Sequence, residues 1–345
     1  MQNDRSSTNS SSPKTLSPTL SQREREKSDL ICAVDLGGTN LRAANVDRDG
    51  RIYERVKTPT PETDQAQDIV SAIVAVVRGC ETAGLKRGAT IQAVSVVVPG
   101  SVQVGTGVVV NAPNIPSLPG FRLAAALGAA IDRPVLLEND ANAAALGEMW
   151  QGAARNSRTI ICLTLGTGVG GAIILDGKLW RGVDGTAGEI GHASVEPFGG
   201  VKCKCGNVGC LEVYASGTAI VRMAREGSAQ HATSSLNSIP LAEWTAETIA
   251  SAAIECDPLA LDVFKKAGAY LGVAMANAIN IFNPEMIVVG GGVSAAWDLF
   301  ARHARDEVMR RAFPVPAARC QIVRAECGDD AGLLGAAWLA FKNRP

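Results

Sequence analysis

One histidine and three cysteines lie close together in a glycine-rich stretch, residues 184–212. In DGTAGEIGHASVEPFGGVKCKCGNVGCLE they are spaced H-x10-C-x-C-x4-C. Three thiolates and one imidazole are the ligands of a closed tetrahedral zinc site. The glycines beside the cysteines allow the tight turns that direct the thiolates to one point. We therefore expect a structural zinc ion to be held by His192, Cys203, Cys205 and Cys210.

These cysteines could instead be small buried side chains or members of disulfides. Burial suits the scattered cysteines Cys32, Cys80, Cys162, Cys256, Cys320 and Cys327, but a loop rich in lysine and glycine offers little apolar core. Disulfides are typical of secreted proteins, whereas this chain has nine cysteines, an odd number, and its start lacks the apolar segment of a signal peptide. Metal binding would supply the folding free energy of such a loop, on the order of 10 kcal/mol in zinc peptides.

Glycine-rich turns follow three separate apolar segments: DLGGTN (Asp35–Asn40), LGTGVGG (Leu165–Gly171) and VGGGVS (Val289–Ser294). Bare backbone N–H groups in such turns can bind phosphate, and the hydroxyls of Thr39 and Thr167 can add donors. One such turn would indicate only a hairpin. Three in one chain favour a nucleotide. The pattern G-x-x-x-x-G-K-[ST] does not occur, which excludes a P-loop enzyme.

A zinc-containing dehydrogenase is a second hypothesis, because Gly166, Gly168 and Gly171 satisfy G-x-G-x-x-G. That fingerprint requires a helix directly after it. Here AIILDGKLW continues as a β-branched strand and a turn. The context therefore favours a phosphoryl transferase over a dehydrogenase.

A phosphoryl transferase that acts on a hydroxyl group needs a base to accept its proton. Asp140 follows a buried strand and opens an Ala-rich helix, and Asn139 before it could orient a polyhydroxylated substrate. Asp is also a common helix N-cap, so the position alone fits a cap as well as a base. Both interpretations place Asp140 where ligands bind in α/β folds, at the carboxyl end of a strand.

The elements that must position these residues are short strands and helices in an alternating order. Residues 30–61 predict three strands, followed by a helix near 62–83, a buried strand at 93–100, a helix near 123–130, a strand at 134–137 and the helix that contains Glu148 and Trp150. Residues 159–182 then repeat the opening plan of three strands. Later segments predict helices at 212–225, 245–256, 258–280 and 294–312, strands at 286–290 and 321–326, and a closing helix at 329–341.

This order predicts an α/β protein with mixed sheets and two similar lobes. We expect a disordered tail over residues 1–29, a smaller lobe over 30–145 that the helix near 329–342 completes, and a larger lobe over 146–328. The formal net charge of −1 argues against a nucleic-acid partner, and no apolar run is long enough to cross a membrane. We expect a cytoplasmic protein with reduced thiols.

In their order, these motifs resemble the signatures of the ROK family of sugar kinases, especially its ATP-dependent glucokinases. The resemblance rests on DLGGTN, VPG with a later NAPN, ENDANAAALGE, LGTGVGG, GEIGH, CKCGNVGCLE and VVGGGVS, and it covers residues 30–341. It implies a two-lobed, actin-like or hexokinase-type fold of the ribonuclease H-like class, with a structural zinc loop. It also implies ATP, Mg²⁺ and Zn²⁺ as cofactors and a homodimer or homotetramer.

The resemblance also implies roles for single residues. Asp140 would be the catalytic base. Contacts to the sugar would come from Asn114, Asn139, Glu189, His192 and Glu212. Phosphates and Mg²⁺ would be held by Asp35, Gly37, Gly38, Thr39, Thr167 and Gly168. The adenosine would lie beside Gly291 and Gly292, and the zinc ligands would be those inferred above.

Glucose is the expected sugar, with mannose, fructose or an N-acetylated hexosamine as alternatives. Some ROK members are transcriptional repressors that carry a helix-turn-helix before this core. Here about 29 polar residues precede it, too few for such a domain, so a repressor or a non-catalytic sugar sensor is a more distant alternative.

Overall fold

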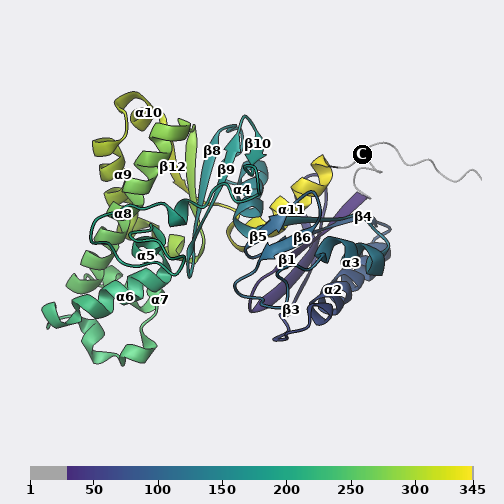
Figure 1. The fold of residues 1–345 in the computed structure, drawn as a ribbon, viewed down its shortest axis with the longest axis horizontal. Helices are drawn as coiled ribbons and strands as arrows, with labels where there is room; N and C mark the ends of the chain where they lie inside the picture. Colours follow the sequence, from purple (N-terminus) through teal and green to yellow (C-terminus); the bar gives the residue numbers. More distant parts are fainter. Residues whose placement is uncertain (1–28, 344–345) are drawn as a thin grey trace, which may run out of the picture.

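The computed structural model describes residues 29–343, and the tail predicted over residues 1–29 lies almost entirely outside that range. Two five-stranded mixed sheets organise the chain (Figure 1). The first has the order β3-β2-β1-β4-β7, from β1 (Asp29–Leu36), β2 (Asn40–Val46), β3 (Ile52–Pro59), β4 (Thr90–Val98) and β7 (Val135–Asn139). The second has the order β10-β9-β8-β11-β12, from β8 (Ile160–Leu165), β9 (Val169–Leu175), β10 (Lys178–Trp180), β11 (Met286–Gly290) and β12 (Gln321–Arg324).

The two sheets share one plan. In each, three consecutive strands form an antiparallel meander, and two later strands add in parallel beside the first strand of that meander. The predicted internal duplication and the mixed sheets are therefore confirmed. Parallel addition requires crossover connections, which here are helical.

Helices cover both faces of each sheet. One face of the first sheet packs against α2 (Ala66–Lys86) and α3 (Leu123–Ile131), and its other face packs against α11 (Ala331–Lys342). The second sheet packs on one side against α6 (Gly217–Gly227), α7 (Ala246–Ile254), α8 (Pro258–Phe282) and α9 (Trp297–Arg311), and on the other side against α4 (Asp140–Gln151). Within residues 29–343, the other α-helices are the short α5 (Glu212–Ala215) and α10 (Pro314–Arg319).

α4 and α11 lie between the two sheets and touch each other along their length (Figure 1). Small residues allow this approach, since a Cβ atom on Gly335 would lie 1.7 Å from the backbone oxygen of Ala143, and one on Gly147 would lie 2.2 Å from that of Ala331. The carboxylate of the buried Glu148 accepts backbone hydrogen bonds from residues 153, 326 and 327. The packing of α4 on α11 and the hydrogen bonds to Glu148 thus hold together the chain segments that connect the two sheets.

Several predicted elements differ from the structure. The helix predicted at 212–225 is two helices, because Ser216 is extended and its hydroxyl caps α6 by accepting from the N–H of Ala219 at 3.1 Å. The helix predicted at 294–312 begins at Trp297, after a 3-10 turn over Gly292–Ala296. β6 (Val108–Asn111) pairs with β5 (Ser101–Gln103) in a hairpin that was not predicted. α10 was also not predicted.

No helix within residues 29–343 combines the length and the apolar character that crossing a bilayer requires.

Candidate functional site

The end of β7 brings Asn139 and Asp140 to the start of α4. Asn139 is the N-cap: its backbone is extended and its Oδ1 atom accepts from the N–H of Asn142 at 3.0 Å. The interpretation of Asp140 as the cap is therefore wrong. An N-cap residue must leave the helical conformation, whereas Asp140 is already the first residue of α4. Its carboxylate accepts from its neighbour's N–H at 2.9 Å and from the amide of Asn139 at 2.8 Å.

The environment of Asp140 favours a base that works near neutral pH. Asp140 is exposed to solvent on one side, and the protein around it reduces the hydration of its carboxylate. The resulting loss of hydration, together with repulsion from the Asp35 carboxylate, raises the pKa of Asp140 from 3.8 to about 6, although the hydrogen bonds from residues 139 and 141 oppose the shift. A base with a pKa near the working pH combines a useful unprotonated fraction with a strong pull on the proton.

The first glycine turn lies beside Asp140 at the end of β1. Asp35 there forms an ion pair with Arg42 of β2. The turn is closed by a hydrogen bond of 2.9 Å from the N–H of Gly37 to the carbonyl of Asn40. Asn114, which is distant in sequence, packs on this turn: a Cβ atom on Gly38 would lie only 2.7 Å from that of Asn114. The fold thus brings the NAPN loop onto the DLGGTN turn.

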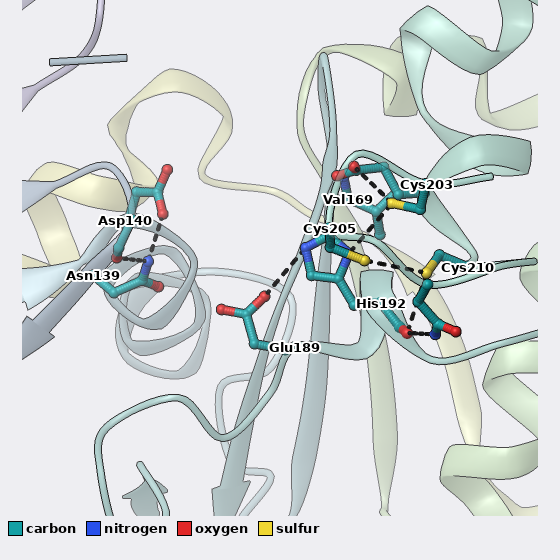
Figure 2. Close-up of polar contacts among 11 residues, drawn as sticks. Asn139, Asp140, Val169, Glu189, His192, Cys203, Cys205 and Cys210 are labelled. Atoms are coloured by element: carbon teal, nitrogen blue, oxygen red, sulfur yellow. Dashed lines mark hydrogen bonds and ion pairs between the residues drawn. The ribbon is translucent and has the colours of Figure 1, made fainter. Parts of the chain in front are cut away.

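Glu189 and His192 face Asn139 and Asp140 from the second sheet. Both residues follow β10 in the chain. Glu189 directly precedes a 3-10 turn over Ile190–His192, and His192 is the last residue of that turn. The Nε2 atom of His192 lies 4.0 Å from the Glu189 carboxylate, and the two side chains are 36% and 56% exposed. Figure 2 shows the Glu189 carboxylate directed toward Asn139 and Asp140. Carboxylate, imidazole and amide groups therefore converge from both sheets.

The other ring nitrogen of His192 faces the cysteines. Its Nδ1 atom lies 3.8 Å from the sulfur of Cys203, and the sulfurs of Cys205 and Cys210 are 3.7 Å apart. One ligand atom from each of the four residues lies within 4.8 Å of all the others. A tetrahedral site with metal–sulfur bonds of about 2.3 Å would separate its sulfur atoms by about 3.8 Å. The donor set and its spacing therefore fit a metal ion, as Figure 2 illustrates.

Glu212 connects this cluster with the second glycine turn. One of its oxygens accepts from the backbone N–H of Val169 at 3.1 Å, and the other lies 3.9 Å from the sulfur of Cys203. A Cβ atom on Gly168 would lie 2.4 Å from the first oxygen. A side chain at position 168 would therefore displace the Glu212 carboxylate, a constraint that the sequence did not reveal.

A cavity of about 900 Å³ opens beside the second and third glycine turns. Thr167 and Gly292 line it, whereas Gly168 and Gly291 do not. Gly291 packs against Leu165 next to the cavity. Its φ is 81°, and a Cβ atom at this position would lie 2.4 Å from the carbonyl oxygen of Leu165. The N-terminus of α6 is held against the second glycine turn, because the N–H of Gly217 donates a hydrogen bond of 2.8 Å to the carbonyl oxygen of Gly166.

Most of the cavity wall was missed by sequence reasoning. It includes Thr218, Arg222, Arg225, Trp244, Thr245 and Glu247, from α6, from α7 and from the two residues before α7. Their only sequence signal was the amphipathic pattern of two helices, which does not tell a pocket wall from an ordinary surface. β9 begins at Val169 and contains Gly171, so a strand rather than a helix forms at the end of the G-x-G-x-x-G pattern, which confirms that this turn is not a dinucleotide-binding fingerprint.

Comparisons with known proteins agree with this arrangement. The ROK family profile matches residues 31–343, and the chain belongs to the ROK family. It is 39% identical to a glucokinase of Halalkalibacterium halodurans, over 89% of this chain and 93% of that protein. A ROK glucokinase of Streptomyces griseus, solved with glucose and AMPPNP, has a TM-score of 0.76 at 36% identity, covering 91% of this chain and all of that one.

Regulators of the family share the fold as well. A ROK family transcriptional regulator gives a TM-score of 0.83 at 28% identity, over 91% of this chain and 78% of that protein. A ROK hexokinase of Thermus thermophilus gives a TM-score of 0.76 at 32% identity, over 91% of this chain and 100% of that one. The hexokinase-type fold inferred from the sequence motifs is therefore confirmed.

Proposed function

We propose that the protein is a sugar kinase that transfers the γ-phosphoryl group of ATP to a hexose, and that D-glucose is converted to glucose 6-phosphate. The observation that carries this proposal is the position of Asp140, a carboxylate of raised pKa that faces Glu189 and His192 from the opposite sheet. The likeness to glucokinases over nearly the whole chain supports the same reaction.

The sugar would lie between the two sheets. Asn139 and Asp140 would bind it from the first sheet, and Glu189, His192 and Glu212 from the second. Asn114 would add a contact from the loop that packs on Gly38. Carboxylates accept and amides both donate and accept, so this set suits several neighbouring hydroxyl groups.

In the reaction, Asp140 accepts the proton of the sugar hydroxyl as that oxygen forms its bond to the γ-phosphorus. The bond between this phosphorus and the bridging oxygen of ADP breaks, and ADP leaves with the bond electrons. Catalysis in this class rests mainly on positioning and on stabilisation of charge. The hydrogen bond from the Asn139 amide holds the Asp140 carboxylate in place for this step.

The nucleotide would occupy the cavity beside the second and third glycine turns, with the adenosine near Gly291 and Gly292. Its phosphates would extend toward Thr167, Gly168 and the first turn at Gly37, Gly38 and Thr39. Asp35 offers the hard oxygen ligand that Mg²⁺ prefers. Mg²⁺ bound with ATP would neutralise phosphate charge, while the first turn holds the phosphates in line with the sugar hydroxyl.

The Cys/His cluster would hold a structural zinc ion through His192, Cys203, Cys205 and Cys210. All four positions of a tetrahedral site are then taken by the protein, which is the arrangement of a structural rather than a catalytic site. The ion fixes the loop and therefore the orientation of the His192 ring. The free Nε2 atom then faces the sugar site beside Glu189.

The domain boundaries given above remain part of this proposal, with α11 completing the smaller lobe, as do a homodimer or homotetramer and a cytoplasmic location. A requirement for ATP and for reduced cysteine ligands fits the cytoplasm.

The proposal is tested by a coupled ADP-release assay with ATP and a panel of hexoses. We expect turnover with glucose and weaker turnover with mannose or fructose. A preference for an N-acetylated hexosamine would correct the substrate, and N-acetylmannosamine kinases are among the relatives of the chain. Absence of turnover with every sugar, together with a sugar-dependent band shift on DNA, would overturn the proposal in favour of a regulator.

A further inference from the structure

A charged pair with no assigned role lies directly beside Asp140. Glu138 is the second-last residue of β7 and is 1% exposed. One of its oxygens accepts from Nε and Nη2 of Arg181 at 2.9 and 2.6 Å. The other oxygen accepts from the amide of Asn142 at 2.9 Å and from the N–H of Asn139 at 3.1 Å. Every oxygen of this buried carboxylate is thus occupied.

The pair joins the edges of the two sheets. β7, which carries Glu138, is the last strand of the first sheet, and Arg181 directly follows β10, the first strand of the second sheet. A partly buried, charged hydrogen bond at this place connects the end of β7 with the residue that follows β10. Each partner is also next to the sugar site in the chain, because Glu138 precedes Asn139, and Arg181 begins the loop that leads to Glu189.

That loop is short and is held at both ends. The carbonyl of Arg181 accepts from the N–H of Ala187 at 3.0 Å, which closes residues 181–187 into a compact turn. Gly188 then packs on β9, where a Cβ atom would lie 2.7 Å from the oxygen of Gly171. A displacement of Arg181 would therefore move the loop and displace Glu189 as well.

The small net free energy expected of such an ion pair indicates that Glu138 and Arg181 position the site rather than stabilise the fold. A buried ion pair gains little net stability, because the desolvation of both charges offsets their attraction. Its effect is directional: a fork of two donors on one oxygen permits few relative placements of the two strands. In active sites, a displacement of about 1 Å can cost about 100-fold in rate.

We propose that Glu138 and Arg181 form a positioning pair that sets the placement of Asn139 and Asp140 against Glu189 and His192. The inference rests on the proposed sugar kinase activity, and it adds two residues to the machinery of that site. Neither residue touches the reacting atoms. The pair acts by fixing the two halves of the sugar site relative to each other.

The test uses four variants of the full chain: Glu138→Gln, Arg181→Gln, the double variant, and Arg181→Ala. Arg133→Gln is the matched control, because Arg133 donates to the largely buried Glu81 at 2.9 Å on the outer side of the first sheet. We expect each Gln single variant to raise the KM for glucose and to lower kcat, together by about 10- to 100-fold in kcat/KM. The KM for ATP should stay within about twofold.

Two further results separate positioning from mere stability. The double variant should be no worse than the worse single variant, since the two residues act as one unit. Ethylguanidinium in the buffer should partly restore an Arg181→Ala variant, because the Arg181 side chain is 28% exposed and the site is open to a small cation. Additive effects, an equal change in the KM for ATP, or normal kinetics accompanied only by a lower melting temperature would overturn the inference.

Hydrogen exchange supplies a readout that does not depend on activity. Amides of residues 182–192 should exchange faster in Glu138→Gln and Arg181→Gln than in the parent, and at the parent rate in Arg133→Gln. Unchanged exchange in the two variants would overturn the inference even if the parent phosphorylates no hexose. A parent without kinase activity would contradict the proposed function alone.

Discussion

The backbone N–H of Val169 donates a hydrogen bond of 3.1 Å to the carboxylate of Glu212. Val169 lies within the second glycine turn and begins β9, and Glu212 stands two residues after Cys210, the last cysteine of the Cys/His cluster. One carboxylate thereby links the cluster to the turn that we propose for phosphate binding. Glu212 therefore links the proposed sugar, metal and nucleotide sites to one another.

Replacement of Glu212 should affect both substrates. Glu212→Ala removes the acceptor of the Val169 N–H, so the turn loses its support together with a sugar contact. Hydrogen bonds to charged groups contribute about 1.5–3 kcal/mol, so we expect the KM for ATP and the KM for glucose each to rise about tenfold or more. Steady-state kinetics of Glu189→Ala is the control, since the Glu189 carboxylate lies 4.0 Å from His192 and, within residues 29–343, accepts no hydrogen bond from the second glycine turn, so its loss should raise the KM for glucose alone. An unchanged KM for ATP in Glu212→Ala would contradict the link.

The nucleotide cavity can be tested at Gly292. No atom lies within 4 Å of a Cβ atom built there, so Gly292→Val should fold normally and fill part of the cavity. We expect a rise in the KM for ATP of at least about tenfold with an unchanged KM for glucose. Gly105→Val, at an equally open position of the first lobe, should change neither. Gly168→Val is a poorer test, because its side chain would collide with Glu212. Equal losses for both substrates in Gly292→Val would point to misfolding.

Asp140→Asn separates catalysis from folding. Because Asn139 is the cap of α4, and because an Asn oxygen can accept the same bonds from residues 139 and 141, the helix should be unaffected. A positioned general base contributes about 10²- to 10⁴-fold, so kcat should fall by that order while glucose still binds. Turnover within a few-fold of the parent, at saturating ATP and glucose, would require another base.

The raised pKa of Asp140 also predicts two effects of pH. The base must be unprotonated, so kcat/KM should fall tenfold per pH unit below about pH 6 and level off above it. For folding, the pKa is higher in the folded state than its ordinary 3.8, so this carboxyl becomes destabilising as pH rises through about 6. The melting temperature of Asp140→Asn should therefore equal or exceed that of the parent at pH 7.5, and the difference should vanish near pH 4. If kcat/KM instead fell only below about pH 4, the raised pKa of Asp140 would be contradicted.

The metal cluster predicts about one zinc ion per chain, measurable by elemental analysis. Cys205→Ala should lose the ion, lower the melting temperature and weaken glucose binding, because the ion fixes the loop that carries His192. Cys256→Ala changes an exposed cysteine outside the cluster and should retain all three properties. Active protein that contains no metal would refute the assignment.

The sequence by itself determined the elements whose signals are local. Alternating apolar segments, glycine turns and the repeated three-strand plan predicted the two mixed sheets, because strand and turn preferences act over a few residues. The spacing of His192 with Cys203, Cys205 and Cys210 predicted a cluster that the fold does bring together. The order of motifs was sufficient to indicate the ROK family, which the profile match confirms.

Tertiary structure alone decided what depends on contacts between distant segments. That Asn139 rather than Asp140 caps α4 depends on the backbone conformation of Asn139, and the raised pKa of Asp140 depends on the loss of hydration caused by the surrounding protein and on Asp35, more than a hundred residues away. The cavity wall on α6 and α7 and the approach of Glu212 to Gly168 also arise only when helices and turns pack. Likewise, Glu138 and Arg181 are unremarkable in the sequence. They meet because the fold brings the end of β7 close to the residue that follows β10, and the buried carboxylate of Glu138 requires a partner for its charge.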